Sequence, residues 1–317
     1  MAGATRPPLL LTMNTPQIVQ RFQEGIALDV MHIQQHADTR LHTHDFSELV
    51  IVLGGSGVHI APTGDYPIVA GDAFILHGQQ AHGYRNTADL ELMNILFRLD
   101  ELGIPRQDIL SLPGYHALFT LEPVFRQRDN FEGRLRLPPD ELQHIAEIAR
   151  RMQRESVNRA AGWRFAAVAC FMLLMADLCR CYSRAEYPAA QSLLRLGRVL
   201  GYLEGHYRDP IALDELASVG EMSRRTLTRE FRRALGCSPI EYLIRLRINH
   251  AVTLLQENGA DITDVAFEVG FGDSNYFARQ FKSVMGCSPR DFRRRAAGDR
   301  SGALVASPRR DDAGDEG

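Results

Sequence analysis

The chain has few cysteines, no marked excess of charge and no long apolar run, and each absence excludes a class of protein. Its five cysteines are odd in number and form no C-x-x-C pair. We therefore expect free thiols in a reducing compartment rather than a disulfide framework. The formal net charge of −3 gives no indication of nucleic-acid binding from bulk charge alone.

No segment is expected to enter a membrane or to direct secretion. Residues 9–11 are three leucines without the charged n-region and apolar core of a signal peptide. The longest apolar run, residues 165–175, is too short to span a bilayer. We expect a cytoplasmic protein without membrane partners, and its 317 residues suffice for two domains of ordinary size.

The clearest positive feature is an internal repeat near the C-terminus. The segment REFRRALGCSP at residues 229–239 recurs as RQFKSVMGCSP at residues 279–289. Each copy is far shorter than a domain, so the repeat indicates a duplicated supersecondary unit rather than a solenoid.

The first copy predicts a helix, a turn and a second helix. Residues 211–217 have helical spacing of apolar positions, residues 219–222 supply a turn with glycine, and Ser223 is a suitable N-cap. The second helix then has an apolar stripe opposite a polar face. The stripe consists of Leu227, Phe231 and Leu235, and the polar face of Arg225, Thr228, Arg229 and Arg232.

The second copy has the same pattern with one more residue in its turn. A helix over residues 262–269 precedes a turn at 270–272, and Asp273 or Ser274 caps the second helix. Phe277 and Phe281 are expected to point inward, while Asn275, Arg279 and Lys282 point outward. Arginine, asparagine and serine can bond base edges in the major groove. One such helix alone is better explained as a solvated surface, but two in series favour a DNA reader.

A long helix is expected between the two copies. Residues 239–257 begin with proline behind Ser238 and end before Asn258-Gly259, a stop signal. At ~1.5 Å per residue this helix is roughly 28 Å long. With the widths of the helices added, the two readers lie about one DNA turn apart, ~34 Å, and fit successive major grooves.

These residues resemble a known family. Residues 192–297 are similar to the DNA-binding domain of AraC/XylS-type transcription regulators, through AFEVGFGDSNYF at 266–277 and the residues that follow it. This region carries 16 Lys and Arg against 13 Asp and Glu. The resemblance implies DNA contacts from Arg225, Thr228 and Arg229 in the first reader and from Ser274, Asn275 and Arg279 in the second, flanked by Arg224 and Asp273.

The N-terminal half reads as a β-structure. Short β-rich segments alternate with glycine-containing turns, which is typical of a sandwich or barrel. The expected strands are residues 47–53, 58–60, 66–69, 73–76 and 90–97, with turns at 54–57, 63–65 and 70–72.

Part of this half resembles the cupin jelly-roll barrel. The pattern consists of His42-x-His44, Glu48, the pair Gly71-Asp72, and His82. In metal-bearing cupins the positions of His42, His44, Glu48 and His82 hold a divalent metal, which suits imidazole and carboxylate ligands. A metal-free polar pocket and purely structural histidines are alternatives. A small effector would be held by residues among His42, His44, Glu48, His77, His82, Tyr84 and Asn94.

The remaining segments complete a two-domain plan. We expect a flexible N-terminus (1–15), an all-β cupin barrel (16–137, irregular after residue 100), two helices (138–182), a linker (183–191), an all-α domain with two helix-turn-helix motifs joined by a long helix (192–297), and a disordered tail (298–317). In the resembled family, helices at 138–182 carry dimerisation. They are equally able to complete the domain core.

The combination predicts a ligand-responsive transcription activator. Residues 44–52 and 94–97 resemble the AraC-type regulators of L-rhamnose use, so a sugar effector is expected, with double-stranded DNA, RNA polymerase and a second copy of the chain as partners. Two alternatives stay open. One is a metal-dependent cupin enzyme with a helical C-terminal domain, and the other is a DNA-binding regulator that works without a ligand.

Overall fold

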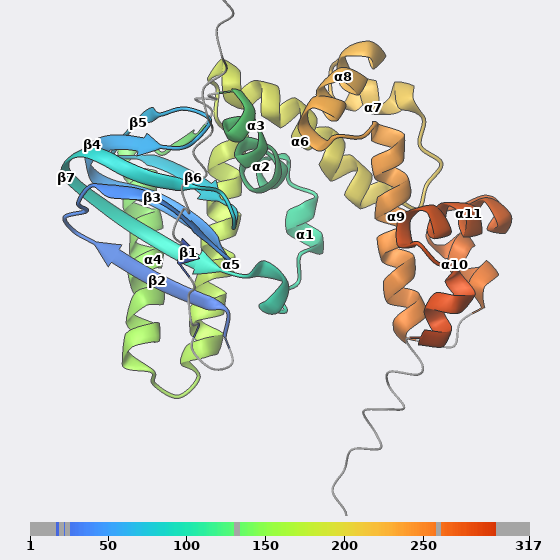
Figure 1. Cartoon of the computed structure of the whole chain (residues 1–317), viewed down its shortest axis with the longest axis horizontal. Coiled ribbons are helices and arrows are strands. Elements are labelled where there is room, and N and C mark those ends of the chain that lie inside the picture. Colours follow the sequence, from blue (N-terminus) through green and yellow to red (C-terminus); the bar gives the residue numbers. More distant parts are fainter. Residues whose placement is uncertain (1–16, 19–21, 23–25, 130–133, 258–260, 296–317) are drawn as a thin grey trace, which may run out of the picture. The chain divides into compact units, whose positions relative to one another are not determined.

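A computed structural model describes residues 17–18, 22, 26–129, 134–257 and 261–295 (Figure 1). The chain forms two compact units, Met1–Gly201 and Tyr202–Gly317. The terminal segments expected to be flexible, 1–15 and 298–317, lie outside the described residues, as does the expected helix stop at Asn258-Gly259.

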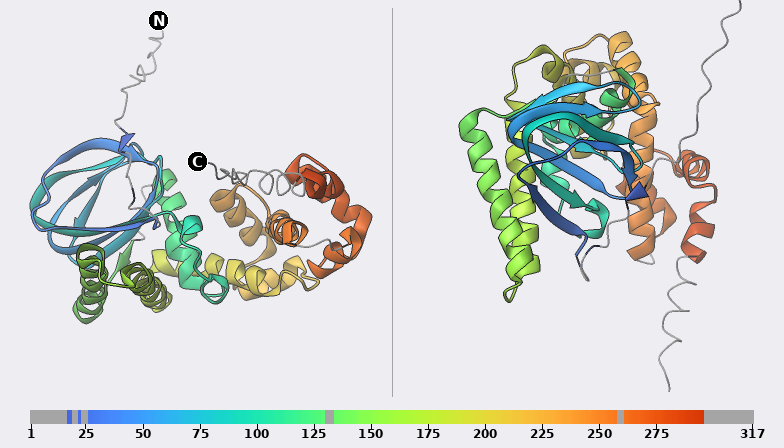
Figure 2. Two further views of the ribbon diagram at one scale, coloured as in Figure 1. Left: turned by 90° about the horizontal axis from the view of Figure 1, so that it is seen from below. Right: turned by 60° about the vertical axis from the view of Figure 1, so that its left-hand side comes forward.

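The first unit is built on an eight-stranded sheet with the order β1-β3-β7-β4-β6-β8, in which β2 pairs with β7 and β5 with β4. All pairs are antiparallel except β1 with β3. Figure 2 shows the strands curving around a common interior, which agrees with the predicted β-domain. The strands are β1 (Gln17–Ile18), β2 (Leu28–Ile33), β3 (Thr39–His44), β4 (Ser47–Ile60), β5 (Tyr66–Val69), β6 (Asp72–Leu76), β7 (His82–Phe97) and β8 (Leu135–Arg136).

Strand β4 runs through the glycine-rich segment that was expected to be a turn. The prediction of a turn at residues 54–57 is wrong, because β4 stays paired with β7 on both sides of this segment. Register shifts between Val52 and Val58 absorb the glycines as bulges. Gly55 has a φ of +68°, and a Cβ there would collide with the backbone carbonyl of Asp89. Glycine is therefore needed for close approach of two strands, not for a reversal.

Short helices occupy the segment after β7, which was expected to be irregular. Pro105, Pro113 and Gly114 interrupt any helical periodicity, which is why the pattern gave no helix signal. Leu118, Leu121 and their neighbours are buried, and this segment packs on β6. The elements are η1 (Leu99–Glu101), α1 (Gln107–Leu110), α2 (Pro113–Tyr115), the π-helical turn η2 (His116–Leu121) and α3 (Glu122–Asp129).

The two helices expected at residues 138–182 are α4 (Pro139–Asn158) and α5 (Trp163–Ser183), which pack against each other. Helix α4 packs on β2, and α5 packs on β7 through Phe171, whose ring centroid lies 5.0 Å from that of Phe97. The other side of α5 exposes Phe165 (83%) and Leu173 (48%) to solvent.

By length and composition alone, α5 could cross a bilayer. This is a difference from the sequence prediction, which considered only the shorter run within it. Leu174, Leu178 and Tyr182 are fully buried, so α5 packs as a core helix of the first unit.

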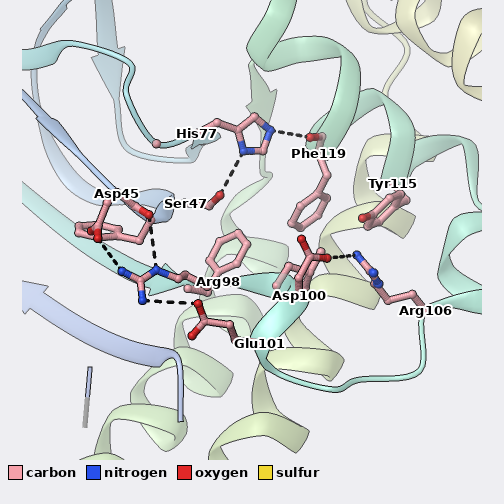
Figure 3. A pocket seen from close by; sticks show the side chains of 13 residues that line it. Asp45, Ser47, His77, Arg98, Asp100, Glu101, Arg106, Tyr115 and Phe119 are labelled. Atoms are coloured by element: carbon pink, nitrogen blue, oxygen red, sulfur yellow. Dashed lines mark hydrogen bonds and ion pairs between the residues drawn. The ribbon is translucent and has the colours of Figure 1, made fainter. Parts of the chain in front are cut away.

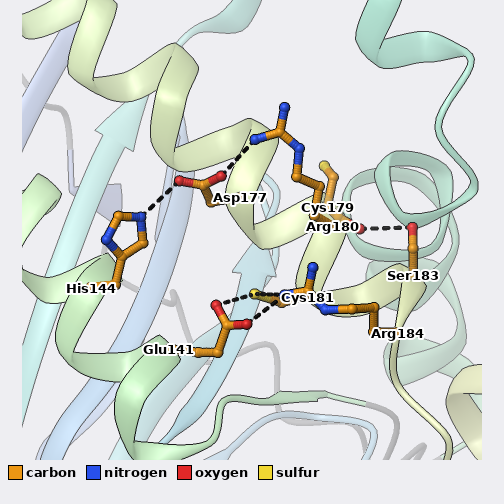
Figure 4. Close-up of polar contacts among 8 residues, drawn as sticks. All are labelled: Glu141, His144, Asp177, Cys179, Arg180, Cys181, Ser183 and Arg184. Atoms are coloured by element: carbon orange, nitrogen blue, oxygen red, sulfur yellow. Dashed lines mark hydrogen bonds and ion pairs between the residues drawn. The ribbon is translucent and has the colours of Figure 1, made fainter.

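Polar contacts fasten α4 to α5 (Figure 4). His144 Nε2 bonds Asp177 Oδ2 at 3.1 Å, and Arg184 pairs with Glu141. The Cys181 thiol donates to Glu141 at 3.1 Å, and burial together with this carboxylate raises the pKa of Cys181 to about 12. The thiol is therefore protonated at neutral pH and is not a reactive thiolate.

The boundary between the two units lies within α6 (Pro188–His206), at Gly201. The predicted linker, residues 183–191, instead lies inside the first unit, where residues 184–187 connect α5 to α6. Close packing explains the difference. A Cβ at Gly197 would collide with the carbonyl of Pro113, and one at Gly201 would lie 2.6 Å from the carbonyl oxygen of Ser111. Helix α6 thus packs closely against α2 at Gly197.

The second unit contains the predicted duplicated motif. Its helices are α7 (Leu213–Val219), α8 (Arg224–Leu235), α9 (Pro239–Glu257), α10 (Ile262–Glu268) and α11 (Ser274–Met285), and the four others all pack on α9. Ser223 caps α8 by accepting the N–H of Thr226, and Asp273 caps α11 by accepting the N–H of Tyr276. The structure agrees with both predicted helix-turn-helix motifs and with the long helix, and of the two predicted caps it selects Asp273.

Replacing Gly197 by alanine tests the seating of α6. The new Cβ collides with Pro113, so we expect the free energy of unfolding to fall by about 1–3 kcal/mol. Gly205→Ala in the same helix is the matched control, because nothing lies within 4 Å of its Cβ position, and it should add up to about 1 kcal/mol. The fluorescence of Trp163, the one tryptophan, measures both in urea. Equal effects would contradict the packing argument.

Candidate nucleic-acid interface and effector pocket

The outward face of α8 gathers basic side chains. The opposite face buries Leu227, Phe231 and Ala234, so the basic side chains are held toward solvent. A shallow surface hollow is lined by Arg224, Arg225, Thr228, Arg229 and Arg232. Four of these were predicted as DNA contacts. Arg232 was placed on this face by its spacing but was not among the predicted contacts.

Two of these arginines are held by neighbouring carboxylates. Arg224 pairs with Asp214 of α7, and Arg229 Nη2 lies 2.9 Å from Glu230 Oε1. Both pairs have exposed guanidinium groups, and exposed pairs contribute only about 0–1 kcal/mol. A phosphate or a guanine can therefore displace the carboxylates at little cost.

Helix α11 presents the matching face of the second motif. Phe277 and Phe281 are fully buried, which leaves Asn275 and Arg279 exposed. These occupy the repeat positions of Arg225 and Arg229, as Lys282 occupies that of Arg232. The guanidinium of Arg279 lies 5.8 Å from the ring centroid of Tyr276, a cation–π distance that holds it near this face.

Asp273 and Ser274, also predicted as DNA contacts, sit at the start of α11. The Asp273 carboxylate is engaged as the N-cap, at 2.5 Å from the N–H of Tyr276. The structure therefore gives Asp273 a structural role as the N-cap of α11. Ser274 is the first helical residue and is partly exposed.

Inside the β-domain, a buried carboxylate lies between two histidines. Glu48 Oε2 is 3.2 Å from His44 Nε2 and 3.6 Å from His82 Nε2. Each histidine directs its Nδ1 at a backbone carbonyl, that of Phe46 or of Gln80, so Nε2 faces Glu48. Burial alone raises the pKa of Glu48, but the two neighbouring imidazoles outweigh this effect and lower the pKa to about 2. Glu48 is therefore ionised at neutral pH.

This cluster fits a divalent metal as a three-ligand site. The ligand atoms of His44, Glu48 and His82 lie within 4.8 Å of one another, and two imidazoles with one carboxylate suit first-row metals. The carbonyl partners of Nδ1 supply the orientation that ligating histidines need. A bound ion would place a positive charge beside Glu48 and offer a coordination position to an effector oxygen.

His42, the fourth predicted ligand, does not join this set. Its Nδ1 lies 3.1 Å from the carbonyl oxygen of Arg40, and its ring packs against that of His82 at 4.4 Å. The alternation of His42 and His44 along β3 explains why one histidine of the pair enters the buried cluster while the other does not.

A cavity of about 340 Å³ opens next to His82. Its polar lining includes His59 and Arg126, with Gln79 and Gln80 on the adjoining loop. His59 is 1% exposed, and neither ring nitrogen has a hydrogen-bond partner among the described residues. Burial, aided by the charge of Arg126, holds the pKa of His59 well below its ordinary value. The neutral ring thus offers one donor and one acceptor.

Tyr84 and Asn94, two of the predicted effector residues, also carry buried polar atoms without partners among the described residues. Both are buried, and within the described part of the chain neither the Tyr84 hydroxyl nor the Asn94 Oδ1 has a partner. The Tyr84 ring lies 5.4 Å from that of His59, and Asn94 follows the inward-facing Leu90 and Leu92 along β7.

His77 was also predicted to bind the effector, but it does not line the cavity beside His82. Its Nδ1 bonds the Ser47 hydroxyl at 3.2 Å, and its Nε2 donates to the carbonyl of Phe119 at 2.9 Å. Figure 3 shows it in a separate cleft, with the ion-paired Arg98 and Asp45 nearby. This histidine joins the sheet to η2 instead of facing the barrel interior.

The sequence did not point to His59 or Arg126. His59 pairs with Tyr66 and Tyr84 on the two strands that flank β4. The only sequence signal for its role was a histidine placed between the apolar residues of a predicted strand. Arg126 had no such signal, because its helix follows a segment without periodicity.

Comparisons with known proteins agree with this geometry. Residues 216–295 match the family model of a helix-turn-helix domain, and residues 29–96 match that of a cupin domain. The HTH-type transcriptional activator RhaS of Klebsiella pneumoniae (strain 342) is 32% identical over 252 residues, which are 80% of this chain and 86% of the relative. RhaS of Escherichia coli O1:K1 is 31% identical over 257 residues, 81% of this chain and 88% of the relative.

Among solved structures, an AraC-type transcriptional regulator from Chromobacterium violaceum is 30% identical. The match covers 34% of this chain and 96% of that one, with a TM-score of 0.32. The two RhaS relatives are named as activators, and they align with both units of this chain over most of their own length. The chain therefore belongs to the AraC-type transcriptional activators related to RhaS, and it is a DNA-binding regulator with a cupin domain rather than an enzyme.

Proposed function

We propose that this regulator activates genes of sugar metabolism when a sugar binds inside its β-domain. The observation that carries the proposal is a cavity lined by His59 and Arg126, two buried side chains with polar atoms that have no hydrogen-bond partner among the described residues. L-rhamnose or a related sugar is the first candidate, because residues 44–52 and 94–97 resemble the L-rhamnose regulators.

The chemistry of the unpaired groups suits a polyhydroxylated ligand. A buried donor or acceptor left unpaired costs about 1–3 kcal/mol, so several in one place favour a missing partner. His59 and Tyr84 can each donate and accept, Asn94 Oδ1 accepts, and Arg126 Nη1 donates. Sugar hydroxyls also both donate and accept. This mixed set supports a ligand-responsive regulator over one that works without a ligand.

DNA binding is assigned to the outward faces of α8 and α11. Arg225, Thr228 and Arg229 would read bases in one major groove, and Ser274, Asn275 and Arg279 in the next. Helix α9, with 19 residues, is roughly 28 Å long at ~1.5 Å per residue, which suits two grooves about one turn apart. Arg232 and Lys282 add positive charge for the phosphates.

A second copy of the chain would use the exposed side of α5. Phe165 and Leu173 are large apolar side chains in solvent there, and Val157 at the end of α4 is 72% exposed. Apolar groups gathered on one face mark an interaction surface. A dimer would present four reader helices to two half-sites, and the activator would contact RNA polymerase from the bound promoter.

Thermal unfolding with sugars tests the effector assignment. A ligand that binds only the folded state stabilises it by RT ln(1 + [L]/Kd), about 2.7 kcal/mol at a hundredfold excess over Kd. We expect L-rhamnose or a related aldose to raise the melting temperature by several degrees, in a panel that also holds sugar acids. If no member of the panel shifts it, the ligand-independent alternative is favoured.

Tyr84→Phe separates stability from ligand binding. Removing a buried hydroxyl that has no partner should stabilise the free protein by about 1 kcal/mol, and removing a ligand contact should weaken sugar binding about tenfold. Denaturant titration and calorimetry measure the two quantities. Tyr187→Phe is the control, because its hydroxyl bonds the carbonyl of Arg134 at 2.8 Å and its loss should destabilise the protein. A Tyr84→Phe protein that loses stability would contradict the assignment.

Alanine at Arg229 or Arg279 tests base reading. Each change should cost about 1–3 kcal/mol of DNA affinity and relax preference at one base position. Gel shifts with a series of point-mutated operator sites measure both effects. Arg245→Ala, an exposed residue of α9, should leave base preference unchanged. Equal weakening on all sites by Arg229→Ala and Arg279→Ala would leave only a phosphate role.

A further inference from the structure

The guanidinium of Arg126 is buried at the edge of the proposed effector cavity, and not all of its nitrogens form hydrogen bonds to described residues. The residue is 5% exposed. Its Nε donates to Glu122 Oε1 at 2.7 Å, and its Nη2 pairs with Glu122 Oε2. Its Nη1 has no hydrogen-bond partner among the described residues. Two of the three nitrogens are thus held by one carboxylate, whereas Nη1 is buried without a hydrogen bond to the described part of the chain, and the Tyr66 ring centroid lies 5.9 Å from the guanidinium.

The environment of Arg126 fixes its direction. Its guanidinium lies 4.8 Å from the ring centroid of Phe74, so the strand β6 supports one face. Glu122 is completely buried and lies one helical turn away on α3, which clamps the side chain. An arginine held by both an aromatic face and a bidentate carboxylate loses little freedom when it forms one more bond.

His59 makes this corner of the cavity a two-residue subsite. It lines the same cavity as Arg126, and both of its ring nitrogens lack partners within the described residues. A neutral imidazole and a free guanidinium N–H together suit an oxygen of an uncharged ligand. Glu122 already pairs with Arg126, so the cavity offers no uncompensated positive charge to a carboxylate group on the ligand.

A run of close contacts connects this subsite to α6. Helix α3 follows η2 without a break, and η2 follows α2. In α2, the N–H of Gly114 donates to the Ser183 hydroxyl at 3.2 Å, and Pro113 lies directly against Gly197 of α6. Helix α6 then continues past Gly201 into the second unit. The π-helical turn η2 lies in the middle of this path, and such turns are frequent at functional sites.

We propose that Arg126 donates its Nη1–H to a hydroxyl or ring oxygen of an uncharged sugar, with His59 as its partner in the subsite, and that the Glu122–Arg126 clamp conveys occupancy to residues 113–126 and on to α6. This rests on the proposed sugar-binding function and adds a recognition residue and a route of regulation. Because the same guanidinium contacts both ligand and α3, the sugar favours the arrangement of α3 in which Nη1 faces the cavity.

Calorimetric titration of the full chain with L-rhamnose, and with the panel of aldoses and aldonates, tests the recognition step. Arg126→Met should weaken aldose binding by about 10- to 100-fold, as expected for a lost charge-assisted hydrogen bond. Arg134→Met is the matched control, because Arg134 is equally buried and paired with Asp72 at 2.7 Å but does not line the cavity. Its affinity should stay within about twofold of that of the unchanged chain.

A double variant guards against loss of folding. Arg126→Met alone leaves Glu122 buried and unpaired, whereas Glu122→Leu with Arg126→Met replaces the whole pair by apolar groups, which is often neutral for stability. We expect the double variant to fold and still to bind aldose weakly. Unchanged aldose affinity in this variant would overturn the proposal while leaving the sugar-binding function intact.

Hydrogen exchange of the same proteins tests the route. Saturating aldose should slow amide exchange in residues 113–126 of the unchanged chain and of Arg134→Met, but not of the double variant. Slowing confined to the strands would overturn the regulatory part. Binding of aldonates in preference to aldoses would overturn the recognition part. If the unchanged chain binds no member of the panel, the proposed sugar function itself fails and the inference fails with it.

Discussion

The packing of two aromatic-bearing helices on one long helix is the constraint on which the DNA-binding unit depends. Phe231 of α8 and Phe277 and Phe281 of α11 are fully buried. A fixed inward face leaves a fixed outward face, since a helix cannot turn without exposing these rings at about 1.5–3 kcal/mol each. Arg229 and Arg279 therefore need no direct support from neighbouring loops. Their direction is set by residues on the opposite side of their own helices.

The interior of the β-domain differs, because it contains buried polar atoms without hydrogen-bond partners among the described residues. Val50, Val52 and Phe74 form a conventional core, yet His59, Tyr84 and Asn94 are buried with unpaired polar atoms in the described structure. Glu48 is ionised in the same interior, and the imidazoles of His44 and His82 lie beside its carboxylate. Each of these unpaired groups lowers the stability of the β-domain, and under the proposed function a sugar would supply the missing hydrogen bonds.

Local signals predicted the C-terminal unit well and the effector pocket only in part. Ser223 and Asp273 are caps whose effect lies within three residues, so sequence spacing was enough to place α8 and α11. The pocket combines β4, β7 and α3 through contacts far apart in sequence. His77 shows the limit, since it follows a strand in which all five residues are buried. Such a strand shows no alternation that could tell on which side the next residue lies.

The two units also differ in how a bound partner changes them. Exposed pairs such as Arg229 with Glu230 can be exchanged for phosphate contacts without moving a helix. The buried Glu122–Arg126 pair has no such freedom, because both groups are out of water and neither can lose its partner cheaply. A ligand that adds a bond to Arg126 must therefore act on the pair as a whole, and thus on α3. If the proposed effector site binds a sugar, burial couples it to α3, whereas the exposed side chains of α8 and α11 can exchange partners without such coupling.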